Sequence, residues 1–418
     1  MKILVLNAGS SSQKSCLYNI EDTLPCELLP DQFNLPELSA PLWEAQIDWL
    51  PQEQTAKLKI ATSTGEKHLE TVPSPTRKKT LSYLLTCLYQ GSTKVLSTLD
   101  KIDVVGHRVV HGGQTYQTSV PITPDVKATI GRLSSLAPNH NPANLEGIEL
   151  IEQLLGNAVP QVAVFDTAFH SQIPKAAAIY PGPYDWVSQG IRRYGFHGIS
   201  HQYCTQRAAQ ILHRPVDQLR LIVCHLGNGA SLSAVKNGKS IDTTMGFTPL
   251  DGLMMGTRSG SVDPGILIHL MRQGHSIDAL DKLLNQSSGL QGISGVSHDL
   301  REIGVAIAQG NPQAQLAQDM YLHRFKSCFG AMLMSLGGVD AIVFTAGVGE
   351  HAAEIRAAAC ESMEFLGVKL DLAENERSPV DRDISTTESA VRVLVIHTQE
   401  DGAIAQACWR YLRSLDKR

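Results

Sequence analysis

The chain has 418 residues, of which 43% are hydrophobic and 6% aromatic, and its 36 basic residues stand against 41 acidic ones. At about 100–200 residues per domain, this length predicts two or three domains whose cores need no disulfide or metal to hold them together. The formal net charge of −5, without blocks of Lys or Arg, excludes nucleic acid as the main partner.

The cysteine and hydropathy patterns narrow the class of protein further. Eight cysteines without any Cys-x-x-Cys spacing predict reduced, mostly buried thiols in a cytoplasmic protein. The first apolar run, residues 3–6, is too short for the core of a signal peptide. Elsewhere no apolar stretch approaches the roughly 20 residues that cross a bilayer. A soluble α/β enzyme is therefore expected, without a membrane partner.

Short apolar runs alternate along the chain with longer amphipathic stretches. Buried strands are predicted at 3–6, 104–105, 162–165, 221–224, 341–344 and 391–396. Helices are predicted at 142–155, 200–212, 312–336 and 402–412, the first capped by Asn141 with Pro142 at its first position. Such alternation predicts an α/β fold with largely parallel sheets. Residues 21–77 are the least regular part and are interpreted as a variable insertion.

One short motif occurs twice, about half a chain apart. Residues 6–12 read Leu-Asn-Ala-Gly-Ser-Ser-Ser, and residues 226–233 read Leu-Gly-Asn-Gly-Ala-Ser-Leu-Ser. Aligned on the Asn, both give Asn-x-x-Ser-x-Ser and predict a strand, a tight turn and a second strand. Two such hairpins indicate two related domains facing one another across a cleft, with chance recurrence of a common turn as the competing interpretation.

The turns have a composition that suits phosphate, because small residues let backbone N–H groups approach an anion. A third glycine-rich turn, residues 344–350, follows an apolar strand and opens a helical stretch. It is typical either of a nucleotide site at a helix N-terminus or of a plain strand-to-helix turn. Neither the Walker A pattern nor Gly-x-Gly-x-x-Gly after a strand is present.

Charged residues lie beside these turns. Arg108 and Arg258 each stand among glycines, where Arg can bind a carboxylate or phosphate through two hydrogen bonds, a surface salt bridge being the alternative. Asp166 and Glu400 follow strands, which suits Mg²⁺ at the carboxyl edge of a sheet. A helix-terminal acid is the alternative, and it is favoured for Glu400 taken alone.

Four histidines lie close to Gly, Pro or Asn, namely His140, His197, His201 and His225. His197 and His201 have the i,i+4 spacing of a zinc pair, but no acidic residue stands between them. These histidines are therefore interpreted as hydrogen-bonding or charged groups near phosphate, not as zinc ligands.

Together these motifs resemble the acetate kinase family, within the superfamily of acetate and sugar kinases, heat-shock chaperone ATPases and actin. The resemblance rests on residues 6–12 and on residues 242–250, Asp-Thr-Thr-Met-Gly-Phe-Thr-Pro-Leu, and it extends to about residue 410. It implies an α/β fold of two duplicated actin-like (ribonuclease H-like) domains with an active-site cleft between them. The N-terminal domain would comprise residues 1–165 and about 400–418, with an insertion at about 21–77, and residues 166–399 would form the nucleotide-binding domain.

The resemblance also implies a reaction and the residues that perform it. The reaction is the reversible, in-line transfer of the γ-phosphoryl group of ATP to acetate, giving acetyl phosphate and ADP. The implied catalytic residues are Arg108, Asp166, His197 and Arg258. Acetate would be bound by Asn7, Arg108, Val110, His140, Phe196 and Pro249. The nucleotide would be bound by Lys14, His225, Leu226, Gly227, Asn228, Gly229, Asp299, Leu300, Arg301, Gly347, Val348, Gly349 and His351. Mg²⁺, or Mn²⁺ in its place, would be held by Asn7, Asp166 and Glu400.

Three positions depart from the family pattern, namely Asn139 for Leu, His351 for Asn and Ile199 for Thr. The position of Asn139 resembles part of the acetate methyl pocket, so a propionate or butyrate kinase of the same family is the nearest alternative. One methylene changes the discrimination between two acids by only about 1–3 kcal/mol. An ATP-hydrolysing clamp like actin or the chaperones is the alternative from another class. The resemblance further implies a homodimer.

Overall fold

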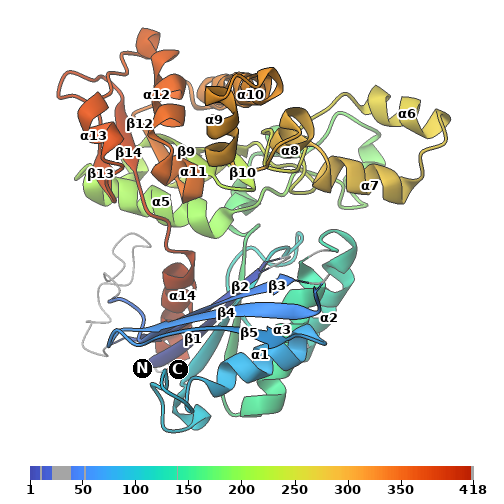
Figure 1. Ribbon diagram of the computed structural model, residues 1–418, viewed down its shortest axis with the longest axis vertical. Helices are drawn as coiled ribbons and strands as arrows, with labels where there is room; N and C mark the ends of the chain where they lie inside the picture. The colour runs from blue at the N-terminus through green and yellow to red at the C-terminus, as the bar shows by residue number, and fades with distance from the viewer. Residues whose placement is uncertain (10–11, 21–38, 51–52, 139, 416–418) are drawn as a thin grey trace. The chain divides into compact units, whose positions relative to one another are not determined.

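The structure, a computed structural model, describes residues 1–9, 12–20, 39–50, 53–138 and 140–415. The chain divides into two compact units, called here unit 1 (Met1–Ala168 and Gln399–Arg418) and unit 2 (Phe169–Thr398). Each unit contains one mixed β-sheet with helices packed against it (Figure 1). The α/β class expected from the sequence is confirmed. Three sets of positions that the sequence analysis discussed lie outside the described residues, namely Ser10 and Ser11, residues 21–38 with one of the eight cysteines, and Asn139.

Unit 1 is built on an eight-stranded sheet in the order β5-β4-β3-β2-β1-β6-β8-β7. Strands β1, β6 and β8 run parallel, and β1 to β5 form an antiparallel series beside them. The strands are β1 (Lys2–Ala8), β2 (Ser12–Asn19), β3 (Trp43–Leu50), β4 (Thr55–Thr62), β5 (Lys67–Pro73), β6 (Val104–Val109), β7 (Val120–Pro121) and β8 (Gln161–Phe165). The helices are α1 (Arg77–Thr86), α2 (Pro124–Arg132), α3 (Asn141–Leu155) and α14 (Glu400–Leu415).

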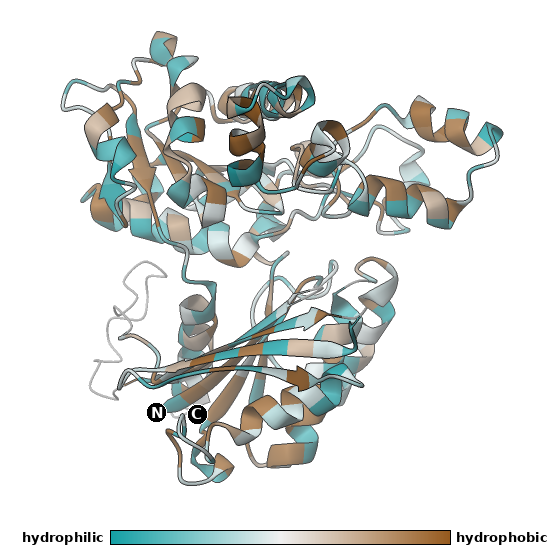
Figure 2. Cartoon of the chain, viewed as in Figure 1, coloured by the Kyte–Doolittle hydropathy of each residue, from teal (hydrophilic) through white to brown (hydrophobic). Residues whose placement is uncertain are grey.

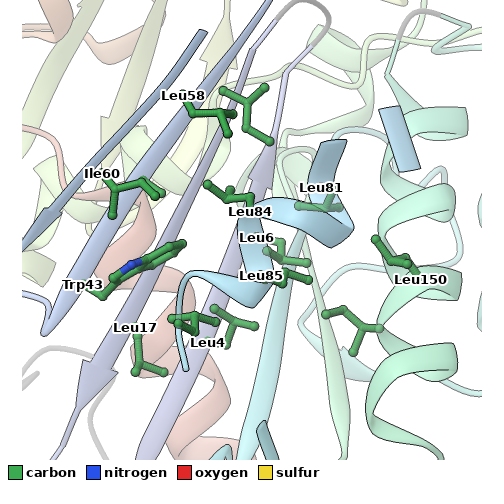
Figure 3. Packing of buried hydrophobic residues seen from close by; sticks show 14 of the residues in the cluster. Leu4, Leu6, Leu17, Trp43, Leu58, Ile60, Leu81, Leu84, Leu85 and Leu150 are labelled. Carbon is green, nitrogen blue, oxygen red and sulfur yellow. The ribbon is translucent and has the colours of Figure 1, made fainter. Parts of the chain in front are cut away.

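Helices cover both faces of this sheet. Leucines of α1 and Leu150 of α3 pack against side chains of the strands, as Figure 3 shows, and Val105 of β6 belongs to the same cluster. A Cβ on the next residue, Gly106, would lie only 2.6 Å from Sγ of Cys408 in α14. Since successive side chains of a strand point to opposite faces, α14 lies on the face opposite α1 and α3.

Unit 2 is built on a six-stranded sheet in the order β11-β10-β9-β12-β14-β13. Its strands are β9 (Arg220–Leu226), β10 (Ala230–Lys236), β11 (Lys239–Thr243), β12 (Ala341–Thr345), β13 (Arg382–Asp383) and β14 (Arg392–Val395). Its helices are α4 (Lys175–Ala178), α5 (Gly198–Ile211), α6 (Pro264–Arg272), α7 (Ile277–Gln286), α8 (Gly289–Ser294), α9 (Leu300–Ala308), α10 (Pro312–Leu336), α11 (Ala346–His351), α12 (Ala353–Glu361) and α13 (Leu372–Glu376).

Adjacent residues of β12 identify the helices on the two faces of this second sheet. Val343 packs with Cys204 and Ala208 of α5. The ring of Phe344, the next residue, lies 6.2 Å from the ring of Phe325 in α10. Helices α5 and α10 therefore cover opposite faces.

The two sheets share one topology at their centres. In unit 1 the hairpin β1–β2 is followed by the parallel strands β6 and β8, and in unit 2 the hairpin β9–β10 is followed by the parallel strands β12 and β14. In both sheets the first strand of the hairpin pairs with the first of these parallel strands. This repeated arrangement is the structural counterpart of the sequence repeat.

The two predicted hairpins are confirmed, but their register differs from the alignment on Asn. Strands β1 and β9 end at Ala8 and Leu226, and their partner strands begin at Ser12 and Ala230, so each connection has three residues. The pairing with the parallel strands gives the same correspondence, because Ile3 of β1 pairs with the first residue of β6 and Leu221 of β9 pairs with the first residue of β12. Structurally, Asn7 therefore corresponds to His225 and not to Asn228.

Most predicted elements are confirmed, and three expectations change. The sheets were expected to be largely parallel, but both are mixed, because antiparallel strands extend the central parallel strands of each sheet. Asn141 does not cap α3, because the N-cap is His140 and the Asn141 side chain instead exchanges two hydrogen bonds with the backbone of His111 (3.1 Å each). The described part of the insertion forms β3, β4 and β5. The seven described cysteines are free thiols. Within the described ranges, no helix has the length and apolar character needed to span a membrane.

Candidate active site

The predicted site residues divide between the two units, and each unit gathers its own group at the carboxyl ends of parallel strands. In unit 1, Asn7 lies in β1, Arg108 in β6, and Asp166 directly after β8. Arg108 donates to one oxygen of Asp166 through Nε (3.0 Å) and Nη2 (2.5 Å), and its Nη1 lies 3.4 Å from Oδ1 of Asn7. The fold thus joins three residues that lie far apart in the sequence.

This ion pair is almost inaccessible to water, since the Asp166 side chain is 1% exposed and that of Arg108 is 14% exposed. Burial opposes the charge on Arg108, but the carboxylates of Asp166 and Glu400 outweigh it and raise the pKa of the guanidinium. Burial raises the pKa of Asp166, and Arg108 offsets part of that rise. The other carboxylate oxygen, Oδ1 of Asp166, is buried and makes no hydrogen bond within the described structure.

The first turn of α14 brings two more carboxylates to this site. Asn7 donates through Nδ2 to Oδ1 of Asp401 at 2.8 Å, whereas Oε2 of Glu400 lies 3.5 Å away. Burial raises the pKa of Asp401, and the Asn7 hydrogen bond acts in the opposite direction. The sequence analysis named Glu400 and missed Asp401, whose contact with a residue 394 positions earlier carries no local signal.

Helix α3 holds the ends of the two strands that carry Asn7 and Arg108. Asn144, which is 2% exposed, donates through Nδ2 to the carbonyl of Ala8 (3.3 Å) and accepts from the N–H of Val110 (3.2 Å) through Oδ1. One side chain therefore connects the end of β1 to the end of β6. Of the other predicted unit 1 residues, Lys14 pairs with Asn7 across the β1–β2 hairpin, Val110 is buried, and His140 occupies the N-cap position of α3.

In unit 2, two of the predicted histidines stack on each other. The rings of His197 and His225 are nearly parallel, with centroids 4.1 Å apart. Nδ1 of His197 lies 2.9 Å from Oγ of Ser231, and Nδ1 of His225 lies 2.8 Å from Oγ of Ser200. Each ring is thereby oriented by a serine hydroxyl on its Nδ1 side.

Arg258 belongs to the same group. A Cβ built on Gly229 would lie 3.4 Å from Nη1 of Arg258 and 3.5 Å from Nε2 of His197, so these two side chains approach the β9–β10 turn together. Arg258 donates to the carbonyl of Pro249 at 3.3 Å, and no carboxylate forms an ion pair with it in the part of the chain that the structure describes. Burial lowers the pKa of this guanidinium.

The loop that carries Arg258 is fixed by the start of α8. The N–H groups of Leu290 and Gln291 donate to the carbonyls of Met255 and Gly256, both at 2.9 Å. Gly256 in turn lies against Asn228, because a Cβ on it would lie 2.1 Å from Oδ1 of that side chain. The Arg258 loop and the 227–229 turn therefore pack against each other.

The two segments expected to bind adenosine also come together. Leu300 at the start of α9 and Val348 in α11 belong to one hydrophobic cluster. Asp299 caps α9 by accepting from the N–H of Arg301 (2.9 Å), and the two side chains form an ion pair that lowers the pKa of Asp299. Gly347 faces open space, where a Cβ would meet no atom within 4 Å.

The predicted turn 344–350 is confirmed as a strand followed by a helix, β12 and α11. Glu350, a residue the sequence analysis did not single out, accepts from the N–H of Ala346 at 2.9 Å and lies 2.6 Å from Nδ1 of His397. Burial would raise the pKa of Glu350, but His397 outweighs it and lowers the pKa. His351 is exposed at the end of α11, and Phe196 is buried before α5.

The side chains that could offer oxygen ligands to a metal lie in unit 1. Asp166, Glu400 and Asn7 supply carboxylate and amide oxygens, and Oδ1 of Asp166 has no other partner within the described structure. The described residues contain no group of three or more His, Cys, Asp or Glu that could hold a metal on its own. Mg²⁺ keeps several water ligands, so the set fits this ion better than a metal that needs an all-protein cage.

Comparison with known proteins gives one consistent family. The profile of the acetokinase family matches residues 2–406. The chain is 66% identical over 410 residues to an acetate kinase of Acaryochloris marina, covering 98% of this chain and 99% of that protein. A crystal structure of Porphyromonas gingivalis acetate kinase matches with a TM-score of 0.86 and 42% identity, covering 98% of this chain and 99% of that one. A propionate kinase structure from Francisella tularensis also matches with a TM-score of 0.86, at 38% identity and with the same coverage.

Proposed function

The chain belongs to the acetokinase family, and from that premise we propose that its residues transfer the γ-phosphoryl group of ATP directly to the carboxylate of acetate. It is an ATP-dependent phosphotransferase that acts on acetate. The observation that carries the assignment of the site is Arg258. A guanidinium that is largely buried, without a carboxylate partner among the described residues, is suited to bind an anion.

The chemistry needs positioning and charge stabilisation more than it needs a base. Acetate is already a carboxylate at neutral pH, so no side chain has to remove a proton from it. Arg258 neutralises charge on the transferring group, and His197 donates a hydrogen bond to it from the same side of the 227–229 turn. Backbone N–H groups of that turn, together with His225 and Asn228, hold the β- and γ-phosphates.

In unit 1, Arg108 neutralises the acetate carboxylate and offsets part of the rise that burial causes in the pKa of Asp166. Asp166, Glu400 and Asn7 would hold Mg²⁺, which would supply positive charge against the nucleotide phosphates. The buried Oδ1 of Asp166, which lacks a hydrogen-bond partner within the described structure, supports this assignment. Asp401 acts through Asn7, because it accepts the Nδ2 hydrogen bond and thereby fixes the direction of the amide oxygen.

The nucleotide lies along unit 2. Lys14 of the β1–β2 hairpin is also assigned to the phosphates, and Leu226 and Gly227 are assigned to the nucleotide at the β9–β10 turn. The adenosine contacts are assigned to Asp299, Leu300, Arg301, Gly347, Val348, Gly349 and His351. Their support is the shared cluster of α9 and α11 and the open space over Gly347.

The length of the acyl chain is the second part of the proposal. Val110, Phe196 and Pro249 are assigned to the methyl pocket, with His140 beside the substrate. A propionate kinase is the second candidate, because the propionate kinase of Francisella tularensis matches this fold as well as an acetate kinase does. Acyl phosphate formation from formate, acetate, propionate and butyrate, trapped with hydroxylamine, distinguishes the two by its optimum.

We also propose that the protein forms a homodimer in the cytoplasm. Helices α6 and α7 expose several apolar side chains, and the α6 ribbon is largely brown in Figure 2. Ile266 and Ile268 are each about half exposed, and Ile277 is 74% exposed. Exposed apolar patches of this kind mark protein interfaces. Light scattering on Ile266→Glu is expected to show monomers where the parent chain shows dimers.

Arg258→Ala tests the assignment of the site. Loss of an arginine that stabilises the transferring group lowers kcat by roughly 10³–10⁵-fold. Arg220→Ala is the matched control, because Arg220 begins β9 at the end away from the turn and pairs with Asp340. A folded Arg258→Ala variant with near-normal kcat would refute the assignment.

A further inference from the structure

One buried hydroxyl connects His197 to a second, deeper histidine. Oγ of Ser231 lies 2.9 Å from Nδ1 of His197 and 2.8 Å from Nε2 of His201. Ser231 and His201 are both 0% exposed, on β10 and α5 respectively. No other partner of the Ser231 hydroxyl occurs within the described structure. The three groups form a chain that runs from the interior of unit 2 to the 227–229 turn.

The hydrogens of this chain can be assigned by elimination. His201 is neutral, since burial lowers its pKa well below the usual range and His170 and His225 add to the effect. A neutral imidazole carries one N–H, and Nδ1 of His201 is buried without a hydrogen-bond partner among the described residues. An unpaired buried N–H is rarer in proteins than an undersatisfied acceptor, so the proton lies on Nε2.

The direction of the remaining bonds follows. Nε2–H of His201 donates to Oγ of Ser231, and a hydroxyl has only one hydrogen to donate in turn. That hydrogen points to Nδ1 of His197, which must therefore accept. The proton of a neutral His197 is then on Nε2, the nitrogen that lies 3.5 Å from a Cβ position on Gly229 beside Arg258.

We propose that Ser231 and His201 are positioning residues that hold His197 as the Nε2–H tautomer, aimed as a hydrogen-bond donor at the anion bound beside Arg258. This inference rests on the proposed phosphoryl transfer. It explains why a histidine next to a phosphate site needs a buried hydroxyl behind it. With Nδ1 protonated instead, Nε2 would present a lone pair to the phosphoryl oxygens and repel them.

The test compares two serines of one strand. Ser231 and Ser233 both lie in β10 and are both 0% exposed, but Ser233 bonds Ser240 and not a histidine. Imidazole ¹⁵N spectra of the full chain report the tautomer of His197, assigned by its loss in His197→Asn. The parent chain and Ser233→Ala are expected to show one tautomer, with Nδ1 unprotonated, and Ser231→Ala a mixture of two.

Kinetics give the second readout. In Ser231→Ala we expect kcat to fall by about 10–100-fold, by analogy with the loss of a group that orients a metal-ligating histidine. KM for ATP and acetate is expected to change less than about threefold. Ser233→Ala is expected to retain kcat. An unchanged tautomer, or an equal loss of kcat in both serine variants, would overturn the proposal.

A second pair of variants tests the same proposal even if Ser231→Ala does not fold. His201→Gln keeps an N–H donor toward Ser231, and His201→Leu removes it. The glutamine variant is expected to retain the single tautomer of His197 and most of kcat, and the leucine variant is expected to lose both. Equal behaviour of the two variants would contradict the proposed positioning role of Ser231 and His201. If the parent chain forms no acyl phosphate from any acid, the proposed function fails. If the parent chain is active but His197 is a mixture of tautomers, only the positioning role of Ser231 and His201 is contradicted.

Discussion

Removing Arg108 is expected to destabilise unit 1 as well as to stop the reaction, and this separates it from Arg258. Arg108→Ala leaves the Asp166 carboxylate, whose side chain is 1% exposed, without its cation. Breaking a buried ion pair by deleting one partner costs about 3–5 kcal/mol. Arg258→Ala deprives no carboxylate of a partner among the described residues, so its stability cost is expected to stay below about 1.5 kcal/mol.

The destabilisation by Arg108→Ala has a predictable pH dependence. Without Arg108, burial raises the folded-state pKa of Asp166 unopposed, above its unfolded value of about 3.9. A carboxyl whose pKa is higher in the folded state binds protons more tightly there, so its contribution to stability decreases as the pH rises from about 4 through the folded pKa. The stability deficit of Arg108→Ala is therefore expected to be larger at pH 8 than at pH 5.

Urea unfolding followed by tryptophan fluorescence measures the loss of stability in unit 1. Trp43, Trp49 and Trp409 all lie buried in unit 1. The double variant Arg108→Ala/Asp166→Ala is the control, because it removes the unpaired charge and should recover most of the deficit. A deficit below about 1 kcal/mol, or one that does not change between pH 5 and pH 8, would show that the ion pair is not buried as described.

Three further changes test how the two sites are built. Gly106→Ala should cost about 1–3 kcal/mol in urea unfolding, because its Cβ would lie 2.6 Å from Sγ of Cys408 and push α14 from the sheet. Asn144→Ala should cost a similar amount, since it leaves a buried carbonyl and a buried N–H unpaired, and Asn144→Asp should recover only the bond to the N–H. Gly256→Ala should raise KM for ATP at unchanged stability, because its Cβ collides with the exposed Asn228 side chain; an unchanged KM would contradict the contact.

Sequence patterns predicted the parallel strands well because those strands are buried on both faces and form continuous apolar runs. Strand β3 was missed, although Trp43, Ala45, Ile47 and Trp49 alternate with polar residues and are all buried. The alternation was present in the sequence, but the irregular residues around it concealed the pattern. Here a search for period-two patterns would have found the strand.

The candidate site was predicted one residue at a time and not as pairs. The sequence indicated Asp166 and Arg108 separately, but it did not indicate that the two form an ion pair, because that depends on β6 and β8 lying side by side. Ser231 stood in the repeated motif, yet its two histidine contacts arise from α5 packing across β10. Residue type and spacing identify the chemistry, whereas the contacts depend on the topology.

The duplicated sheets show how one topology supplies sites of opposite charge. Superposing the strand pairings of the two units places His225 on Asn7, Thr345 on Arg108 and Thr398 on Asp166.

The equivalent strand ends therefore carry an ion pair in unit 1 and neutral hydroxyls in unit 2. Unit 1 adds the carboxylates of Glu400 and Asp401 to that ion pair, so acidic side chains outnumber basic ones at this site, which suits a cation. Unit 2 adds Arg258 from outside the sheet, beside His197 and the 227–229 turn. The Glu350 carboxylate near these strand ends is paired with His397, so the Arg258 guanidinium suits an anion. A phosphoryl transfer assisted by a metal needs both kinds of site, and the repeat can accommodate both because the equivalent positions carry Arg108 and Asp166 in unit 1 but Thr345 and Thr398 in unit 2.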